Sequence, residues 1–243
     1  MARIRPSQAL FSLLVLITTY LSYLALSPPN PTASPPPDTG DILRRLHITD
    51  DFTNFLLLAP TPLIASHVAL LALFYPNIPA WLLRNGVPEQ NALNTDLITW
   101  SSSTIVPLML LLCIGIPLRL AAYASLGEDF TFGLAPPVNG GLRTTGLYGY
   151  LQHPSYTGLF ITIVCVQTLF GRMDGVLSCW IKPRWYKGLR LAERWVTTPL
   201  GLALLLAMVG SRVREEERML EDTFGKEWND WRQHTARFVP GLF

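Results

Sequence analysis

Long runs of apolar residues constrain this chain more than any other feature. A helix of roughly 20 residues crosses the ~30 Å hydrocarbon core of a bilayer, and several runs approach or reach that length. Only 15% of the 243 residues are charged, against about 25% in a typical soluble domain. We therefore predict an all-α fold, a polytopic integral membrane helix bundle with about five spanning segments. The runs cover residues 9–26, 52–75, 98–122, 156–170 and 196–210.

The segments around these runs predict the domain organisation. Residues 1–26 carry two arginines before the first run, which suits a first transmembrane helix, a signal anchor or a signal peptide that is cleaved. Residues 27–51 begin with a proline-rich linker, a composition typical of an extended loop. Residues 52–122 hold two further predicted spans, and residues 123–243 hold the polar motifs described below.

Two polar segments flank the last apolar run. Residues 171–194 are basic and contain tryptophans, a combination that indicates the membrane surface. From Ser211 onward, apolar residues recur at helical spacing, which predicts an amphipathic helix that leaves the membrane and is interrupted at Gly225. Charge leaves the membrane orientation open. If the last two runs both span the membrane, the basic segment and the polar motifs lie on opposite sides of it. Either the basic segment then departs from the positive-inside rule, or one of the two runs enters the membrane and returns to the same side.

Charge and cysteine content argue against two function classes. A net charge of +2, without a basic tract interleaved with aromatic residues, gives no basis for nucleic-acid binding. The three cysteines, Cys113, Cys165 and Cys179, form no C-x-x-C pair. We interpret them as small apolar packing residues rather than as a disulfide or a metal site.

Two polar blocks stand out against the apolar runs. The first extends from Gly146 to Gly158 and contains His153 directly before the fourth run. Glycine permits close approach of a ligand or a helix, and histidine both donates and accepts hydrogen bonds. The second block begins at Arg212, four residues before Glu216, so the two side chains share one face of a helix. Taken singly, such residues are more often structural; their ordered combination indicates a ligand site.

The order and spacing of these blocks resemble the isoprenylcysteine carboxyl methyltransferase family. The resemblance covers roughly the C-terminal half of the chain, and the broader group includes phospholipid N-methyltransferases. A G-x-Y-x-x-x-x-H-P-x-Y-x-G pattern is followed by an apolar hairpin, a second pattern that starts R-x-x-x-E-E, and a closing R-F-V-P. The matching residues are Gly146, Tyr148, His153, Pro154, Tyr156, Gly158, Arg212, Glu216, Glu217, Leu220, Phe224, Gly225, Glu227, Trp228, Trp231 and residues 237–240.

The resemblance implies a multi-helix membrane enzyme that uses S-adenosylmethionine as its methyl donor. The implied reaction is methylation of the C-terminal carboxylate of a prenylated cysteine in CaaX-processed proteins, in the endoplasmic reticulum membrane. The prenylated cysteine of proteins or peptides and the lipid bilayer are then the expected partners. Residues 123–243 become the expected methyltransferase region, with no metal at the site.

The resemblance also assigns roles to individual residues. Arg212 matches the family position that meets the substrate and is the expected catalytic and substrate-binding arginine. The expected cofactor-binding residues are Gly140, Gly141, Leu142, Arg143, Tyr148, His153, Pro154, Ser155, Tyr156 and Glu216.

The chemistry of these residue types suits such roles. A glutamate accepts hydrogen bonds from the ribose hydroxyls or the ammonium of the donor, and backbone N–H groups meet its carboxylate. A tyrosine ring offers its face to the sulfonium. An acceptor carboxylate, with a reference pKa of roughly 4, is already ionised at neutral pH, so the reaction requires no general base.

Three alternatives remain open. The family usually has arginine directly before the histidine, where this chain has Gln152, and the loss of that charge leaves room for a phospholipid or other lipid methyltransferase. The C-terminal part of the NADPH-dependent sterol reductases is similar as well, although those proteins are longer. A catalytically degenerate membrane scaffold of the same family is the third alternative, and it predicts no cofactor binding.

Overall fold

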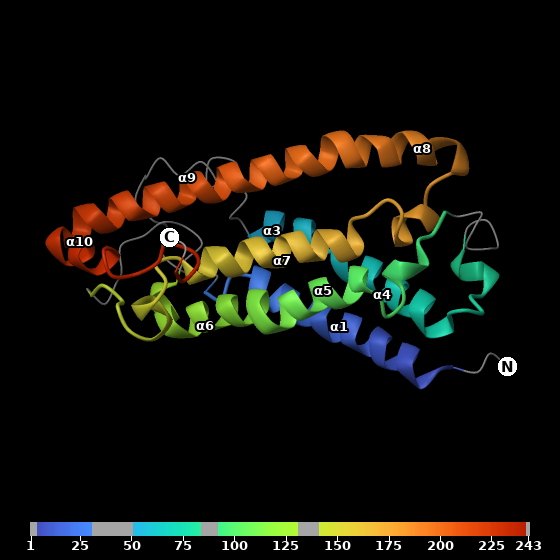
Figure 1. Cartoon of the computed structure of the whole chain (residues 1–243), viewed down its shortest axis with the longest axis horizontal. Coiled ribbons are helices and arrows are strands. Elements are labelled where there is room, and N and C mark those ends of the chain that lie inside the picture. Colours follow the sequence, from blue (N-terminus) through green and yellow to red (C-terminus); the bar gives the residue numbers. More distant parts are fainter. Residues whose placement is uncertain (1–3, 31–50, 84–91, 131–140, 242–243) are drawn as a thin grey trace. The chain divides into compact units, whose positions relative to one another are not determined.

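The computed structural model describes residues 4–30, 51–83, 92–130 and 141–241 (Figure 1). Within these ranges the regular structure is helical and contains no strand, which confirms the all-α prediction. The α-helices are α1 (Pro6–Leu26), α3 (Asp51–Leu58), α4 (Pro60–Phe74), α5 (Ser102–Leu110), α6 (Ile116–Leu126), α7 (Pro154–Phe170), α8 (Pro183–Ala192), α9 (Thr198–Phe224) and α10 (Lys226–Arg232). Gly140 and most of the proline-rich loop lie outside the described residues.

Four helical stretches are long and apolar enough to cross a membrane, and α7, with 17 residues, is apolar but shorter. The predicted membrane helix bundle is therefore confirmed, and the protein is an integral membrane protein. The four stretches are Pro6–Leu26, Thr53–Phe74, Thr95–Asp129 and Pro183–Phe224.

Prolines inside the apolar runs shape the helices without ending the spans. Pro60 begins α4, where its missing N–H costs nothing because the first helical N–H groups have no intrahelical partner. Pro117 lies at the start of α6, directly after a π-helical turn at Leu111–Gly115. Because proline removes one helical donor, a wider turn before it keeps the third stretch continuous.

The last helical stretch is longer than the apolar run that predicted it. Residues 171–194 were expected as a surface segment, but the helix begins at Pro183 and passes through a π-helical turn, Glu193–Thr197, into α9. Between Pro183 and Arg194 the only helix breaker is Gly188, so nothing in the basic part of the sequence stops the helix. The interruption at Gly225 is confirmed: α9 ends at Phe224, and Gly225 has a φ of 51°, a conformation that glycine adopts without steric cost.

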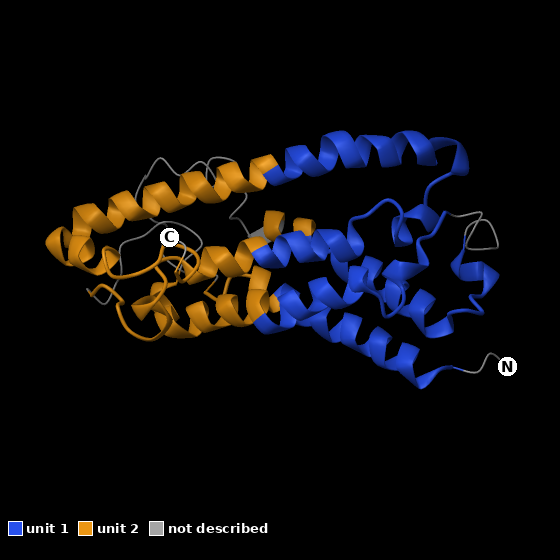
Figure 2. Ribbon diagram, in the orientation of Figure 1, with its two compact units in different colours: residues 1–23, 58–113, 161–202 blue, residues 24–57, 114–160, 203–243 orange. Residues whose placement is uncertain are grey.

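The chain folds into two compact units (Figure 2). Unit 1 comprises residues 1–23, 58–113 and 161–202, and unit 2 comprises residues 24–57, 114–160 and 203–243. In unit 1, Ser12 Oγ donates to the carbonyl of Ala69 at 2.8 Å, which joins α1 to α4. The ring of Trp100 meets Phe11 edge to face, with centroids 5.3 Å apart.

Unit 2 is built around a close crossing of α6 and α7. A Cβ added at Gly158 would lie 2.7 Å from the carbonyl oxygen of Gly115, so the glycine allows the two backbones to touch. One turn along α6, the buried Arg119 donates from Nε to the carbonyl of Ala25 at 3.0 Å and also donates to Ser155 Oγ. These contacts fix the N-terminal end of α7, where the first polar block ends.

Candidate functional site

The two polar blocks predicted from the sequence come together in unit 2. The first block forms a 3-10 turn at Gly146–Gly149 and then leads into the N-terminus of α7. The second block occupies the C-terminal part of α9, then α10 and the segment after it. Side chains of the two blocks bond directly, although the bonded residues are 60 and 64 positions apart in the chain.

The first of these contacts joins His153 to Glu217. His153 is 2% exposed, and its Nε2 lies 3.0 Å from Oε1 of Glu217. The same carboxylate accepts two bonds from Arg237, from Nε to Oε1 and from Nη2 to Oε2, both at 2.7 Å. A carboxylate accepts only, so the imidazole proton lies on Nε2 in this arrangement. Glu217 therefore fixes the imidazole tautomer and links His153 to Arg237.

The second contact joins Tyr156 to Glu216. The Tyr156 hydroxyl donates to Oε2 of Glu216 at 2.7 Å. Arg212, one helical turn before Glu216 on α9, is 4% exposed and interacts with the same tyrosine. The other oxygen of Glu216, Oε1, lies 4.0 Å from His153 Nδ1, which is too long for a hydrogen bond. Each of the two adjacent glutamates thus has its own partner in the first block.

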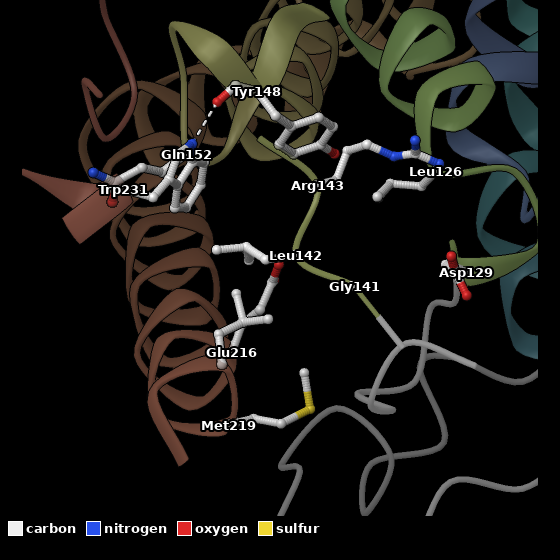
Figure 3. A pocket seen from close by; sticks show the side chains of 11 residues that line it. Leu126, Asp129, Gly141, Leu142, Arg143, Tyr148, Gln152, Glu216, Met219 and Trp231 are labelled. Atoms are coloured by element: carbon white, nitrogen blue, oxygen red, sulfur yellow. Dashed lines mark hydrogen bonds between the residues drawn. The ribbon is translucent and has the colours of Figure 1, made fainter. Parts of the chain in front are cut away.

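A pocket of about 340 Å³ lies beside these contacts (Figure 3). This volume falls in the range of small-molecule sites, about 300–1,000 Å³. Charged side chains, aromatic rings and apolar side chains all face it, so the pocket suits a ligand of mixed polarity. The lining residues are Leu126, Asp129, Gly141, Leu142, Arg143, Tyr148, Gln152, Glu216, Met219, Leu220 and Trp231.

The pocket residues of the two blocks are held together by hydrogen bonds. Trp231 Nε1 donates to the carbonyl of Tyr148 at 2.9 Å (dashed in Figure 3). Gln152 Nε2 donates to the carbonyls of Arg232 and Thr235 at 3.0 and 2.8 Å. Burial, and then the negative charge of Glu216, raise the pKa of the Tyr148 phenol well above its usual value. Tyr148 is therefore neutral at physiological pH and available as a hydrogen-bond donor.

The predicted site residues fall into two groups. Gly141, Leu142, Arg143, Tyr148 and Glu216 line the pocket. The others in the described part of the chain do not line it: Pro154 begins α7, Ser155 bonds to Arg119, and His153, Tyr156 and Arg212 form the layer that contacts the two glutamates.

Three residues with direct contacts in the site received no role from the sequence. Arg119 bonds to Ser155, Glu217 joins His153 to Arg237, and Trp231 lines the pocket. An arginine inside an apolar run is costly in a membrane and usually functional or structurally bound, so Arg119 was detectable from that signal alone. Among the described residues, no group of His, Cys, Asp or Glu side chains is arranged to hold a metal ion.

The residue types around the pocket fit the chemical groups of S-adenosylmethionine. Arg143 supplies a cation for its carboxylate, and Glu216 supplies an acceptor for its ammonium or ribose hydroxyls. The rings of Tyr148 and Trp231 supply surfaces for the adenine and the sulfonium. The pocket therefore has a complementary group for each part of this ligand.

Comparison with known proteins points to one family. The model of the isoprenylcysteine carboxyl methyltransferase family matches residues 108–182, which include α6 and the whole first polar block. The protein-S-isoprenylcysteine O-methyltransferase of Schizosaccharomyces pombe is 28% identical over 131 residues. That alignment covers 53% of this chain and 46% of the relative, so the chain matches about half the length of that curated protein. The resemblance of this chain to the isoprenylcysteine carboxyl methyltransferase family is thereby confirmed.

Proposed function

We propose that this protein transfers a methyl group from S-adenosylmethionine to the C-terminal carboxylate of a prenylated cysteine. The observation that carries the proposal is the pocket of unit 2, where Glu216 of the second block lines the same cavity as Arg143 and Tyr148 of the first. The name of the matched relative supports the same acceptor. The lipid-soluble tail of such an acceptor also suits a protein whose helices lie in the bilayer.

Cofactor binding is assigned to the residues that line the pocket. Glu216 accepts from the ligand while Tyr156 holds its carboxylate from behind. Arg143 pairs with the ligand carboxylate, together with the backbone N–H of Gly141. When bound, S-adenosylmethionine supplies a methyl group on a positively charged sulfur, which becomes a neutral thioether as the methyl carbon bonds to the acceptor oxygen.

Arg212 is the residue that we assign to the acceptor carboxylate. A guanidinium pairs with a carboxylate through two parallel N–H···O bonds and so fixes its direction. Because Arg212 is only 4% exposed, an acceptor paired with it would be withdrawn from water, where ion pairing is stronger. The acceptor is ionised before it binds, so the work of these residues is alignment and exclusion of water.

The cellular setting follows from this acceptor. Prenylated cysteines are exposed at the C-terminus of CaaX proteins after processing, and we place the reaction in the endoplasmic reticulum membrane. Gln152 does not exclude this acceptor, because its amide donates to two backbone carbonyls, Arg232 and Thr235, and an arginine at the same position has the donors to do the same.

A methyl-transfer assay tests the proposal. Membranes that contain the full-length protein receive radiolabelled S-adenosylmethionine with either N-acetyl-farnesylcysteine or phosphatidylethanolamine. We expect base-labile label on the prenylcysteine and its loss in Glu216→Ala. The matched control is Glu221→Ala, which removes an exposed glutamate from the same helix and should keep activity.

The other outcomes separate the alternatives. Label on phosphatidylethanolamine alone would replace the prenylcysteine with a phospholipid acceptor. No label on either acceptor, together with intact binding of S-adenosylhomocysteine, would retain the cofactor and reject both acceptors. Absence of cofactor binding in the wild-type protein would favour a degenerate scaffold.

A further inference from the structure

The closing motif of the chain, Arg237 to Pro240, has no part in the proposed chemistry, yet it is tied to the site by several bonds. The backbone N–H of His153 donates to the carbonyl of Arg237 at 3.1 Å. Thr157 Oγ1 donates to the carbonyl of Phe238 at 3.0 Å, and the Phe238 ring lies 5.8 Å from the His153 ring. Arg237 and Phe238 therefore lie directly on the N-terminus of α7.

Backbone pairing extends this contact toward the pocket. The N–H of Gln152 donates to the carbonyl of Ala236 at 2.8 Å, and the N–H of Ala236 donates to the carbonyl of Tyr150 at 3.0 Å. Leu151 and Ala236 form an isolated parallel bridge. Two irregular segments that are far apart in the sequence are thus paired over residues 150–153 of the first block.

Three pocket residues lie on these paired segments or at their ends. Tyr148 and Gln152 belong to the first block, and Trp231 belongs to α10, just before the closing segment. Their direct bonds, Trp231 to the Tyr148 carbonyl and Gln152 to Arg232 and Thr235, run between the same two parts of the chain as the backbone pairing. One side of the pocket is therefore formed where the first block meets α10 and the closing segment, residues 236–240.

The Arg237–Glu217 ion pair is the charged link that holds it. Both guanidinium bonds are 2.7 Å, a bidentate geometry that lysine cannot reproduce. Glu217 is 20% exposed and Arg237 42% exposed in their side chains, so solvent weakens the pair only in part. Arg237 bonds to Glu217 of α9 through its side chain and to His153 of the first block through its backbone carbonyl, so this residue joins the closing segment to two other parts of unit 2.

We infer that Arg237 is a positioning residue for the pocket: by pairing with Glu217 it holds the closing segment on the first block, so that Tyr148, Gln152 and Trp231 stand together. This inference deepens the proposed function, because the pocket in question is the one assigned to S-adenosylmethionine. It assigns to the R-F-V-P motif the task of completing the pocket rather than of touching the reacting atoms.

Two measurements on the purified full-length protein in detergent test this inference. The first is amide hydrogen exchange of the peptides that contain Gln152, His153 and Ala236, whose N–H groups bond across the two segments. The second is the dissociation constant of S-adenosylhomocysteine, measured by calorimetry. The variants are Arg237→Gln, Arg237→Lys, Glu217→Gln and the double variant Arg237→Gln/Glu217→Gln.

We expect Arg237→Gln to speed exchange in these peptides and to weaken S-adenosylhomocysteine binding by about tenfold, as for the loss of a charged hydrogen-bonded pair. Glu217→Gln should give a similar effect, and the double variant should be little worse than either single variant, because the pair is already broken. Arg237→Lys should weaken S-adenosylhomocysteine binding less than Arg237→Gln, because it keeps the positive charge but not the bidentate geometry. The control is Arg218→Gln, an exposed arginine beside Glu217 that has no acid of the described chain within ion-pair distance; it should behave as wild type.

The results separate this inference from the proposed function. Wild-type exchange in Arg237→Gln, or faster exchange with an unchanged dissociation constant, would overturn the positioning role while leaving the cofactor assignment intact. Failure of the wild-type protein to bind S-adenosylhomocysteine would instead reject the cofactor. In that case faster exchange in Arg237→Gln but not in Arg218→Gln would still support the link between the segments.

Discussion

The hydroxyl of Tyr156 donates a 2.7 Å hydrogen bond to Oε2 of Glu216, although 60 positions separate the two residues in the chain. Tyr156 lies in the first turn of α7, and Glu216 lies near the end of α9. Because Glu216 also lines the pocket, the phenol restricts the direction of the carboxylate that a ligand meets. This hydrogen bond joins the first polar block to the second at the wall of the pocket.

Removing this hydroxyl should weaken ligand binding without changing the charge of the site. For Tyr156→Phe we expect the affinity for S-adenosylhomocysteine to fall about tenfold, since a hydrogen bond to a charged group contributes about 1.5 kcal/mol or more. Calorimetry on the purified protein measures it. Tyr150→Phe is the matched control, because that tyrosine belongs to the same block but is 73% exposed. Equal affinities in all three proteins would show that the bond does not orient Glu216 for the ligand.

Substitution of Arg212 tests the acceptor side of the site. Arg212→Lys keeps a positive charge but loses the planar fork that pairs with a carboxylate. We expect kcat/KM for N-acetyl-farnesylcysteine to fall about a hundredfold, in line with the cost of misaligned reactants, while S-adenosylhomocysteine affinity changes little. Arg214→Lys, an exposed arginine on the same helix, serves as the control. An unchanged kcat/KM in Arg212→Lys would remove Arg212 from the acceptor site.

Much of the fold could be predicted from the sequence, because membrane helices leave a strong local signal. The third apolar run, residues 98–122, lies inside the helical stretch Thr95–Asp129, and its prolines change the helix type without breaking it. The extent of the last stretch could not be predicted in the same way. Hydropathy marks the apolar part of a helix, whereas α8 is basic and continues past Ala192 into the π-helical turn, so hydropathy does not mark where the helix begins.

From the sequence, the residues of the two motifs could be assigned to the site, but their contacts could not. Glu216 and Tyr148 were expected and lie at the pocket, but the partner of each motif residue depends on the fold. Glu217 illustrates the limit: on an isolated helix it is one of three consecutive glutamates, which are usually solvated. Its position between His153 and Arg237 arises because the segment that contains Arg237 and Phe238 folds back onto α7, and no local pattern reports such a contact.

Helix packing at Gly158 gives a prediction about stability. In Gly158→Ala the new Cβ would lie 2.7 Å from the Gly115 carbonyl oxygen and 2.9 Å from the Arg119 backbone nitrogen. Both are backbone atoms, so they can move away from the new Cβ only if the helix itself shifts. We expect a loss of about 1–3 kcal/mol from overpacking, measured as a lower unfolding temperature in detergent. Gly201→Ala is the matched control: it is also helical, nothing lies within 4 Å of its Cβ position, and the higher helix propensity of alanine should leave stability equal or improved. A Gly158→Ala protein as stable as the control would show that α6 and α7 can separate at this crossing.

The ion cluster of unit 1 gives a prediction about pH. Asp174 is 5% exposed and accepts from Arg172 at 2.8 and 2.7 Å and from Arg190 at 3.3 Å. Burial alone would raise the pKa of this carboxyl, but the two arginines outweigh burial and hold the pKa below its usual value of 3.8. An acid whose pKa is lower in the folded state stabilises the protein above the unfolded pKa and loses this contribution as pH falls through the folded one.

Asp174→Asn should therefore lower the unfolding temperature at pH 7, by an amount equivalent to about 2 kcal/mol for a buried carboxylate whose two arginine partners are partly exposed. The difference from wild type should stay constant down to about pH 4 and then close as the pH falls below 3.8, the usual pKa of the group. Thermal unfolding scans in detergent, at pH values from 7 to 3, measure this difference in unfolding temperature. All scans use one heating rate, so that irreversible unfolding affects the proteins equally. Asp222→Asn, an exposed aspartate on α9, should follow the wild-type curve throughout. A difference between Asp174→Asn and wild type that did not depend on pH would mean that the side chain stabilises unit 1 through its shape and neutral hydrogen bonds rather than through its charge.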